Sequence, residues 1–143
     1  MKAGLAVALT LALAAAASAQ QQERVDGFGG FFFRAEQPKV LAQWYRDQLG
    51  INLIPADYDH EPWKQLEGYT AFAPMVEGTK MWRADRSFML NFRVKNLDAM
   101  VAQLRRAGVA VKVDPMTYPN GRFAELEDPE GNPIQLWEPK GKK

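Results

Sequence analysis

The chain has 143 residues, enough for one domain with its own hydrophobic core but too few for two. Its 18 basic residues nearly balance its 17 acidic ones, and no stretch gathers enough Lys or Arg to follow a run of phosphates. Nucleic acid is therefore not an expected partner. The absence of Cys from the sequence excludes disulfides, thiolate nucleophiles and thiolate metal ligands.

Residues 1–19 have the pattern of a secretory signal peptide. Lys2 supplies the positive charge, an apolar run of Leu, Ala and Val follows, and Ala17 and Ala19 fit the small-x-small rule of signal peptidase. Cleavage would leave Gln20 first. We expect a periplasmic or secreted protein with no membrane attachment after cleavage. The alternative is that the apolar run is retained as an N-terminal anchor.

The first half of the remaining chain contains one clear helix. A polar leader, residues 20–27, precedes the expected domain at 28–139. Pro38 begins a predicted helix at 38–48, and Gly50 lies just past its end. Strands are predicted around it, although the alternation is weak in the later ones: 30–35, 51–54, and a hairpin of 63–67 with 69–74. A basic tail, 140–143, ends the chain.

The second half repeats this order. A strand is predicted at 88–94, and Asn96 caps a helix that ends at Gly108. A strand at 109–113 and a hairpin of 122–127 with 133–138 follow, turned at residues 128–132, whose Asp, Pro and Gly suit a tight turn.

An internal duplication explains the recurrence. When Phe33-Arg34 is laid on Phe92-Arg93, Arg46 falls on Arg105, and the order of strand, helix, glycine and apolar strand recurs. The prediction is an α+β fold of two βαβββ modules.

Three segments resemble the vicinal oxygen chelate superfamily, which includes glyoxalases, bleomycin-resistance proteins and extradiol dioxygenases. They are Phe31-Phe32-Phe33-Arg34 with Trp44-Tyr45-Arg46 and Leu49-Gly50, then Phe92-Arg93-Val94 with Ala107-Gly108-Val109, and Asp128-Pro129-Glu130-Gly131-Asn132-Pro133-Ile134-Gln135-Leu136-Trp137. The resemblance implies that the two βαβββ modules form a cupped mixed or antiparallel sheet with the helices on its outer face. It also implies that the modules enclose a cleft for a small substrate, usually beside a divalent metal.

Alternation along the strands separates the two faces of the predicted sheet. One face is wholly apolar and should lie under the helices: Phe31, Phe33, Ala35, Leu90, Phe92, Val94, Ile134 and Leu136. The other mixes aromatic and hydrogen-bonding groups: Gly30, Phe32, Arg34, Met89, Asn91, Arg93, Gln135 and Trp137. Such a mixture suits a small-molecule site, and the superfamily's curvature would make that face concave. The alternative is that it is the solvent side of an open sheet.

The resemblance places the superfamily's metal-ligand positions on Gly30, Met89 and Gln135. A glycine, a thioether and an amide do not suit a divalent cation, so no cofactor is expected and a divalent metal is disfavoured. His60, the single histidine of the sequence, belongs to a polar loop that we expect to be solvated. The orientation of Glu125, Glu127 and Glu138 stays open at this point, so no catalytic residue is assigned.

The leading hypothesis is therefore an exported glyoxalase-like protein that binds a small molecule. The predicted contacts are Phe32 and Trp137 as walls, with Arg34, Asn91, Arg93 and Gln135 as polar groups. The two guanidinium groups favour an anionic ligand. Two alternatives stay open. One is a metal-dependent lyase, isomerase or dioxygenase of the superfamily, and the other is a structural module that forms a homodimer.

Overall fold

The computed structural model describes residues 23–141, which fall into two units, Met1–Phe32 and Phe33–Lys143. In the first unit, residues 23–32 contain no helix or strand. The predicted signal peptide, 1–19, lies outside the described residues. Across the described part of the chain, no helix combines the length and the apolar character needed to cross a bilayer.

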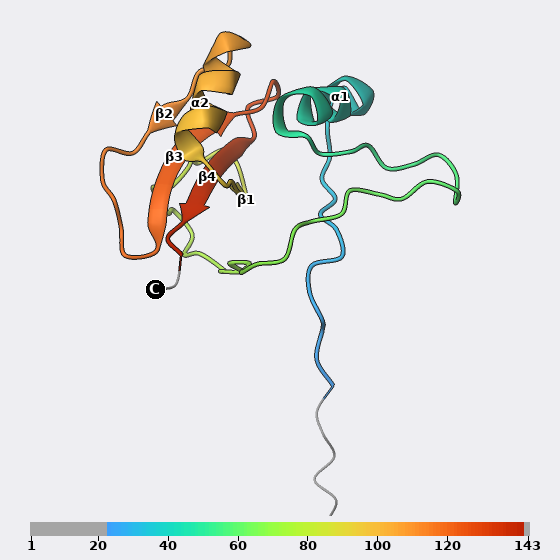
Figure 1. Ribbon diagram of the computed structural model, residues 1–143, viewed down its shortest axis with the longest axis horizontal. Coiled ribbons are helices and arrows are strands. Elements are labelled where there is room, and N and C mark those ends of the chain that lie inside the picture. The colour runs from blue at the N-terminus through green and yellow to red at the C-terminus, as the bar shows by residue number, and fades with distance from the viewer. Residues whose placement is uncertain (1–22, 142–143) are drawn as a thin grey trace, which may run out of the picture. The chain divides into compact units, whose positions relative to one another are not determined.

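The second unit holds all of the regular structure in the described residues (Figure 1). Its elements are α1 (Pro38–Leu49), β1 (Leu90–Arg93), α2 (Leu97–Arg106), β2 (Lys112–Val113), β3 (Gly121–Glu127) and β4 (Pro133–Pro139). The strands form one mixed sheet in the order β1-β4-β3-β2, in which β1 is parallel to β4 and the other pairs are antiparallel. The strand β1 therefore has one edge with no partner strand in the described residues.

Both helices begin and end near the residues that the sequence indicates. Pro38 occupies the first turn of α1, and Gly50 ends the helix at a φ of 70°, with its N–H donating to the carbonyl of Arg46. The side chain of Asn96 caps α2 by accepting a hydrogen bond from the N–H of Ala99 at 2.9 Å. These predictions are confirmed.

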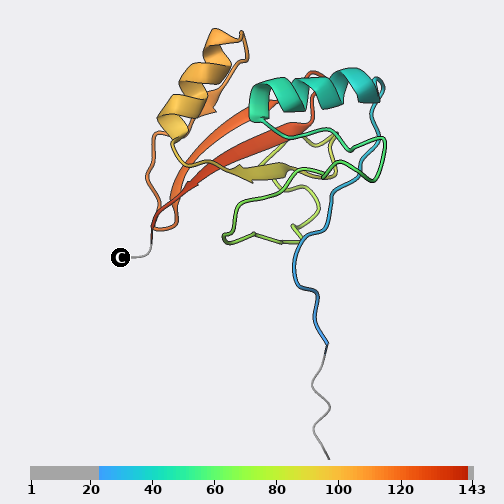
Figure 2. The same ribbon diagram turned by 45° about the vertical axis from the view of Figure 1, so that its right-hand side comes forward.

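Both helices lie on the same side of the sheet (Figure 2), and their apolar faces form the core. The core contains Leu41, Tyr45, Leu97, Val101, Leu104, Val111, Ala124, Leu126, Ile134 and Leu136. The largest fully buried side chains among them are those of Leu97, Leu104, Ile134 and Leu136. The predicted α+β class, with a mixed sheet and helices on one face, is confirmed.

The turn between β3 and β4 is organised by the buried carboxylate of Asp128. One oxygen accepts hydrogen bonds from the N–H groups of Glu130 and Asn132, both at 2.9 Å. The other accepts from the amide of Asn132 and from the hydroxyl of Tyr45, both at 2.8 Å. Burial first, and then Asp128, raise the pKa of Tyr45 far above its usual value, so the hydroxyl stays a donor. Asp128 thus connects the turn to α1.

The same turn caps the first helix. The carboxylate of Glu130 accepts hydrogen bonds from the N–H groups of Glu36 and Gln37, at 2.9 and 2.8 Å, so it satisfies two donors at the start of α1. The guanidinium of Arg86 donates to the carbonyls of Glu130 and Gly131, at 2.6 and 3.0 Å. The closing hairpin therefore fixes the position of α1 on the sheet.

The strands expected in the first half are absent from the structure. Residues 30–35, 51–54, 63–67 and 69–74 have no strand pairing, and the sheet comes entirely from the second module. Ile54, Leu66 and Phe72 are each at least 76% exposed, so the apolar alternation in these ranges buries little surface. Strand propensity depends on packing against neighbouring side chains. These residues have too little such packing to form a ladder of backbone hydrogen bonds.

Candidate functional site at the free edge of the sheet

The sheet turns a polar and aromatic face away from the helices. Core residues Ala124, Leu126, Ile134 and Leu136 point toward the helices, so the side chains between them point to the other side. That other face, called the open face below, carries Asn91, Arg93, Phe123, Glu125, Glu127, Gln135 and Trp137. Glu138 instead lies on the helix side and accepts a hydrogen bond from the N–H of Leu97 at 2.6 Å.

Four of the six predicted contact residues are neighbours on the open face. In the register of β1 and β4, Asn91 pairs with Gln135 and Arg93 with Trp137. The amide of Asn91 donates to that of Gln135 at 2.8 Å, and the indole N–H of Trp137 donates to the carbonyl of Asn120 at 2.8 Å. The alternation of side chains along β1 and β4 therefore places these four residues together on the open face. Their role in binding stays a prediction.

The other two predicted contacts are Phe32 and Arg34. Phe32 belongs to the separate N-terminal unit and is 83% exposed. Arg34 is exposed at the start of the second unit.

A cavity of about 420 Å³ lies along the free edge of β1, and we call it the edge cavity. Five consecutive residues, 91–95, line it. Side chains alternate between the two faces of a strand, so a cavity confined to one face could not contact all of them. On the helix side its walls are apolar: Leu49, Ile51, Phe92, Val94, Met100 and Leu136. Asn91 and Arg93 are the predicted contacts that line it, whereas Arg34, Gln135 and Trp137 do not.

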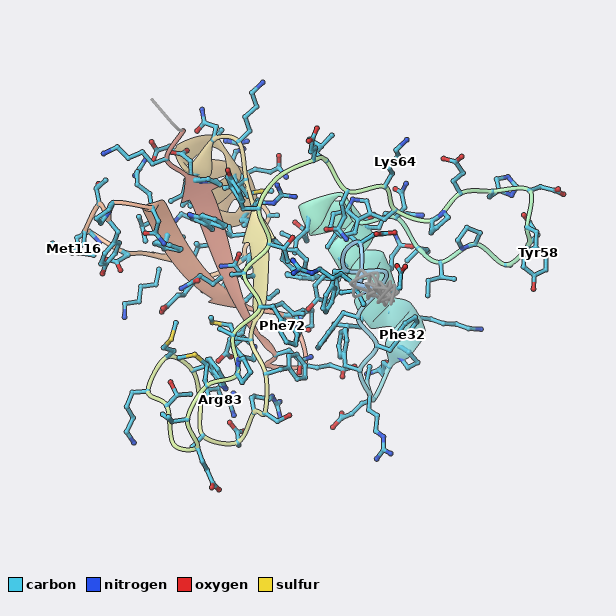
Figure 3. All side chains as sticks on the ribbon, turned by 90° about the horizontal axis from the view of Figure 1, so that it is seen from below. Phe32, Tyr58, Lys64, Phe72, Arg83 and Met116 are labelled. Carbon is cyan, nitrogen blue, oxygen red and sulfur yellow. The ribbon has the colours of Figure 1, made fainter. Side chains whose placement is uncertain are left out.

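The chain between α1 and β1 provides the remaining wall. Residues 63–67 and 69–71 line the edge cavity, and in Figure 3 the chain from Lys64 to Phe72 passes alongside β1. The indole of Trp63 makes an edge contact with the ring of Phe92, with 6.4 Å between their centroids. We call residues 63–71 the covering segment.

Arg93 joins the covering segment to β1. Its two terminal nitrogens donate to the carbonyls of Leu66 at 2.7 Å and Glu67 at 3.0 Å. Gly68 follows directly, with a φ of 153°, and a Cβ on it would overlap Nη1 of Arg93. Glycine therefore lets the backbone of the covering segment lie against the guanidinium.

Sequence reasoning missed the covering segment as a wall of the site. It predicted a hairpin there, and it assigned Phe92 and Leu136 to the core alone. The exposed apolar side chains of Trp63, Leu66 and Tyr69 are the signal that could have identified it, because a loop seldom carries so many without a use.

His60 lies beside a second depression, away from the edge cavity. This depression measures about 340 Å³ and also contacts Arg46 and Asn52. The ring of His60 lies 2.7 Å from Asp57, and this hydrogen bond is the main reason that the pKa of Asp57 is lowered. Both side chains are at least half exposed, so the pair forms a solvated loop contact rather than a rigid site.

The residues at the superfamily's metal positions do not fit a metal ion. The carbonyl oxygen of the Gln135 side chain already accepts a hydrogen bond from Asn91. Met89 offers only a thioether, which suits soft metals, and Gly30 offers no side chain. Among residues 23–141, no three His, Asp or Glu side chains gather in a way that could hold a cation.

The fold and the site together define a class: an α+β module with a β1-β4-β3-β2 sheet, two helices on one face and a cavity at the sheet edge. A family model described as a glyoxalase-like domain matches residues 30–137. The chain therefore belongs to the glyoxalase-like domain family, and the resemblance to the vicinal oxygen chelate superfamily is confirmed. Among curated proteins, none matches the sequence significantly.

Several solved structures are similar to this chain. An antibiotic-binding protein from Streptomyces sp. CB03234 is 30% identical, with 74% of this chain and 88% of that one covered and a TM-score of 0.46. A glyoxalase/bleomycin resistance protein from the same strain is 27% identical, with 73% and 92% covered and a TM-score of 0.43. A putative glyoxalase family protein from Bacillus anthracis is 19% identical, with 71% and 84% covered and a TM-score of 0.44.

Proposed function

We propose that this protein binds a small, largely apolar molecule in the edge cavity, without the help of a metal ion. The observation that carries the proposal is the lining of the cavity. Side chains from α1, α2, β1 and β4 form a continuous apolar wall, and a few polar groups such as Asn91 lie at the strand edge. Apolar walls with a few orienting polar groups are typical of small-molecule sites, and about 420 Å³ is within their usual size.

The absence of a suitable ligand set supports the metal-free part of the proposal. A divalent cation needs about three protein donors such as imidazole or carboxylate, and the superfamily's positions here offer a glycine, a methionine and an amide already in use. Purified mature protein is accordingly expected to bind zinc, nickel, manganese and iron only weakly. Stoichiometric metal that survives gel filtration would contradict this part.

The cavity is tested by narrowing it. Ala71 lines the cavity, so Ala71→Leu should weaken the binding of a neutral aromatic probe, 2-naphthamide, by about tenfold, or about 1.4 kcal/mol. Isothermal titration calorimetry measures the dissociation constant. Ala102→Leu is the matched control, because Ala102 is exposed on α2 and outside the cavity, and it should leave binding unchanged. Equal weakening by both variants, or no binding by the unaltered protein, would contradict the proposal.

We also propose that the protein is exported after cleavage between Ala19 and Gln20. The support is the order of residues within 1–19, where a positive charge is followed by an apolar run and then by small residues. When the full chain is produced in a Gram-negative host, intact-mass measurement of the periplasmic fraction should give a protein that begins at Gln20. Ala19→Arg should block this processing. A mature protein that still contains residues 1–19 would contradict the proposal.

A further inference from the structure

We infer that Arg93 is the anion receptor of the edge cavity and that the backbone of the covering segment holds it ready for a ligand carboxylate. This inference rests on the proposed function, since it specifies the ligand of the same cavity. It assigns two roles: Arg93 contacts the ligand, and Gly68 is a positioning residue that acts through Arg93.

The charges around the cavity favour an anion. Three cationic side chains line it, those of Lys64, Arg93 and Lys95, against the single carboxylate of Glu67. A site with an excess of positive charge and apolar walls attracts a molecule that has an apolar body and a negative group.

Arg93 contrasts with four of the eight arginines of the second unit, which each pair with a carboxylate. Arg46, Arg83 and Arg122 each form an ion pair with an aspartate, at 3.2, 2.6 and 2.7 Å. Among the described residues Arg93 forms no ion pair, and its partners are two neutral carbonyls. A carboxylate would therefore find an uncompensated positive charge at the wall of the cavity.

The hydrogen bonds that Arg93 already makes leave donors for a ligand. A guanidinium has five N–H donors, and the covering segment uses one from each terminal nitrogen. Among residues 23–141, Nε of Arg93 has no acceptor, so the side edge formed by Nε and one terminal nitrogen can bind a carboxylate through two parallel bonds. The two carbonyls fix the orientation of the guanidinium before the ligand arrives, which lowers the entropic cost of binding.

Gly68 makes this orientation possible. Its φ of 153° favours glycine, and an added Cβ would overlap the guanidinium of Arg93. In a Gly68→Ala variant the flexible end of Arg93 would move away, and the hydrogen bonds to Leu66 and Glu67 would be lost. The positive charge would remain in the protein, but its position would no longer be fixed.

The test compares 2-naphthoate with its neutral counterpart 2-naphthamide, by calorimetry at low salt. For the unaltered protein we expect the carboxylate to bind about tenfold to a hundredfold more tightly, as charge-assisted hydrogen bonds predict. Arg93→Gln should abolish this preference, so that the carboxylate and the amide bind with equal affinity. Gly68→Ala should reduce the preference several-fold through loss of orientation.

Two control variants separate this effect from general perturbation. Gly78 also has a positive φ, 79°, but an added Cβ would meet nothing within 4 Å, so Gly78→Ala places a side chain at a positive φ without touching Arg93. Arg106→Gln removes one positive charge from the exposed end of α2. Both should keep the preference of the unaltered protein. The amide serves as an internal reference in each variant, so partial unfolding cannot imitate the effect.

The outcomes distinguish the two proposals. Equal affinities for carboxylate and amide in the unaltered protein would overturn the role of Arg93 and leave the cavity as a binding site. A preference that survives in Arg93→Gln would do the same. Failure of both compounds to bind would overturn the proposed function and this inference with it. If Gly68→Ala and Gly78→Ala reduced the preference for the carboxylate equally, the positioning role of Gly68 would be overturned.

Discussion

Replacing Asp128 by alanine should lower the free energy of unfolding by about 3–4 kcal/mol, because the change leaves buried donors without an acceptor. Asp128 is 4% exposed and accepts four hydrogen bonds, from the hydroxyl of Tyr45, two backbone N–H groups and the amide of Asn132. Urea unfolding followed by circular dichroism measures the change, and the midpoint should fall while the slope stays constant.

A second tyrosine–aspartate pair provides the control for this prediction. Tyr45→Phe should lower the free energy of unfolding by about 1–2 kcal/mol, since one charge-assisted hydrogen bond in a buried site is lost. Tyr118 donates a similar hydrogen bond to Asp114 at 3.0 Å, but its side chain is 39% exposed, so water can replace the lost partner. Tyr118→Phe should change stability by no more than about 0.5 kcal/mol. Similar losses of stability in Tyr45→Phe and Tyr118→Phe would show that burial does not make the hydrogen bond to Asp128 the stronger of the two.

Leu104→Ala should destabilise the domain by about 2–5 kcal/mol, through lost apolar burial and the cavity left behind. Leu104 has no exposed surface and packs between α2 and the sheet. The size of the loss within this range depends on how far α2 can settle toward the sheet. Thermal and urea unfolding at neutral pH measure it.

The same substitution at Leu66 is the matched control. Leu66 is 88% exposed, so Leu66→Ala should change stability by less than about 0.5 kcal/mol even though the same atoms are removed. A loss at Leu66 comparable to that at Leu104 would mean that the covering segment contributes to the core, contrary to the exposure found here.

Much of the second module could be predicted from the sequence because its signals are local. Asn96 marks the start of α2, and the turn residues 128–132 fix the register of the closing hairpin. Once that register is set, alternation decides which side chains of β3 and β4 face the helices. The orientations of Glu125 and Glu138, which the sequence left open, follow from the same register.

The first half could not be predicted with the same success, because a strand needs a neighbour. Apolar and polar residues alternate only weakly in 63–74, and these residues are mostly exposed. The expected hairpin therefore depended on strand propensity alone. The edge cavity was equally inaccessible to sequence reasoning. Its wall combines Leu49 at the end of α1, Met100 on α2 and Phe92 on β1, and their proximity depends on how the helices pack on the sheet.

The cap on α1 has a consequence for the order in which the protein matures. Glu130 lies 94 positions after Glu36, and Asp128 lies 83 positions after Tyr45, so α1 depends on contacts with residues that are synthesised much later. Contacts between such distant residues form slowly, because a long loop must close first. A nascent chain that stops before the closing hairpin would therefore hold an amphipathic helix with neither its cap nor its anchor.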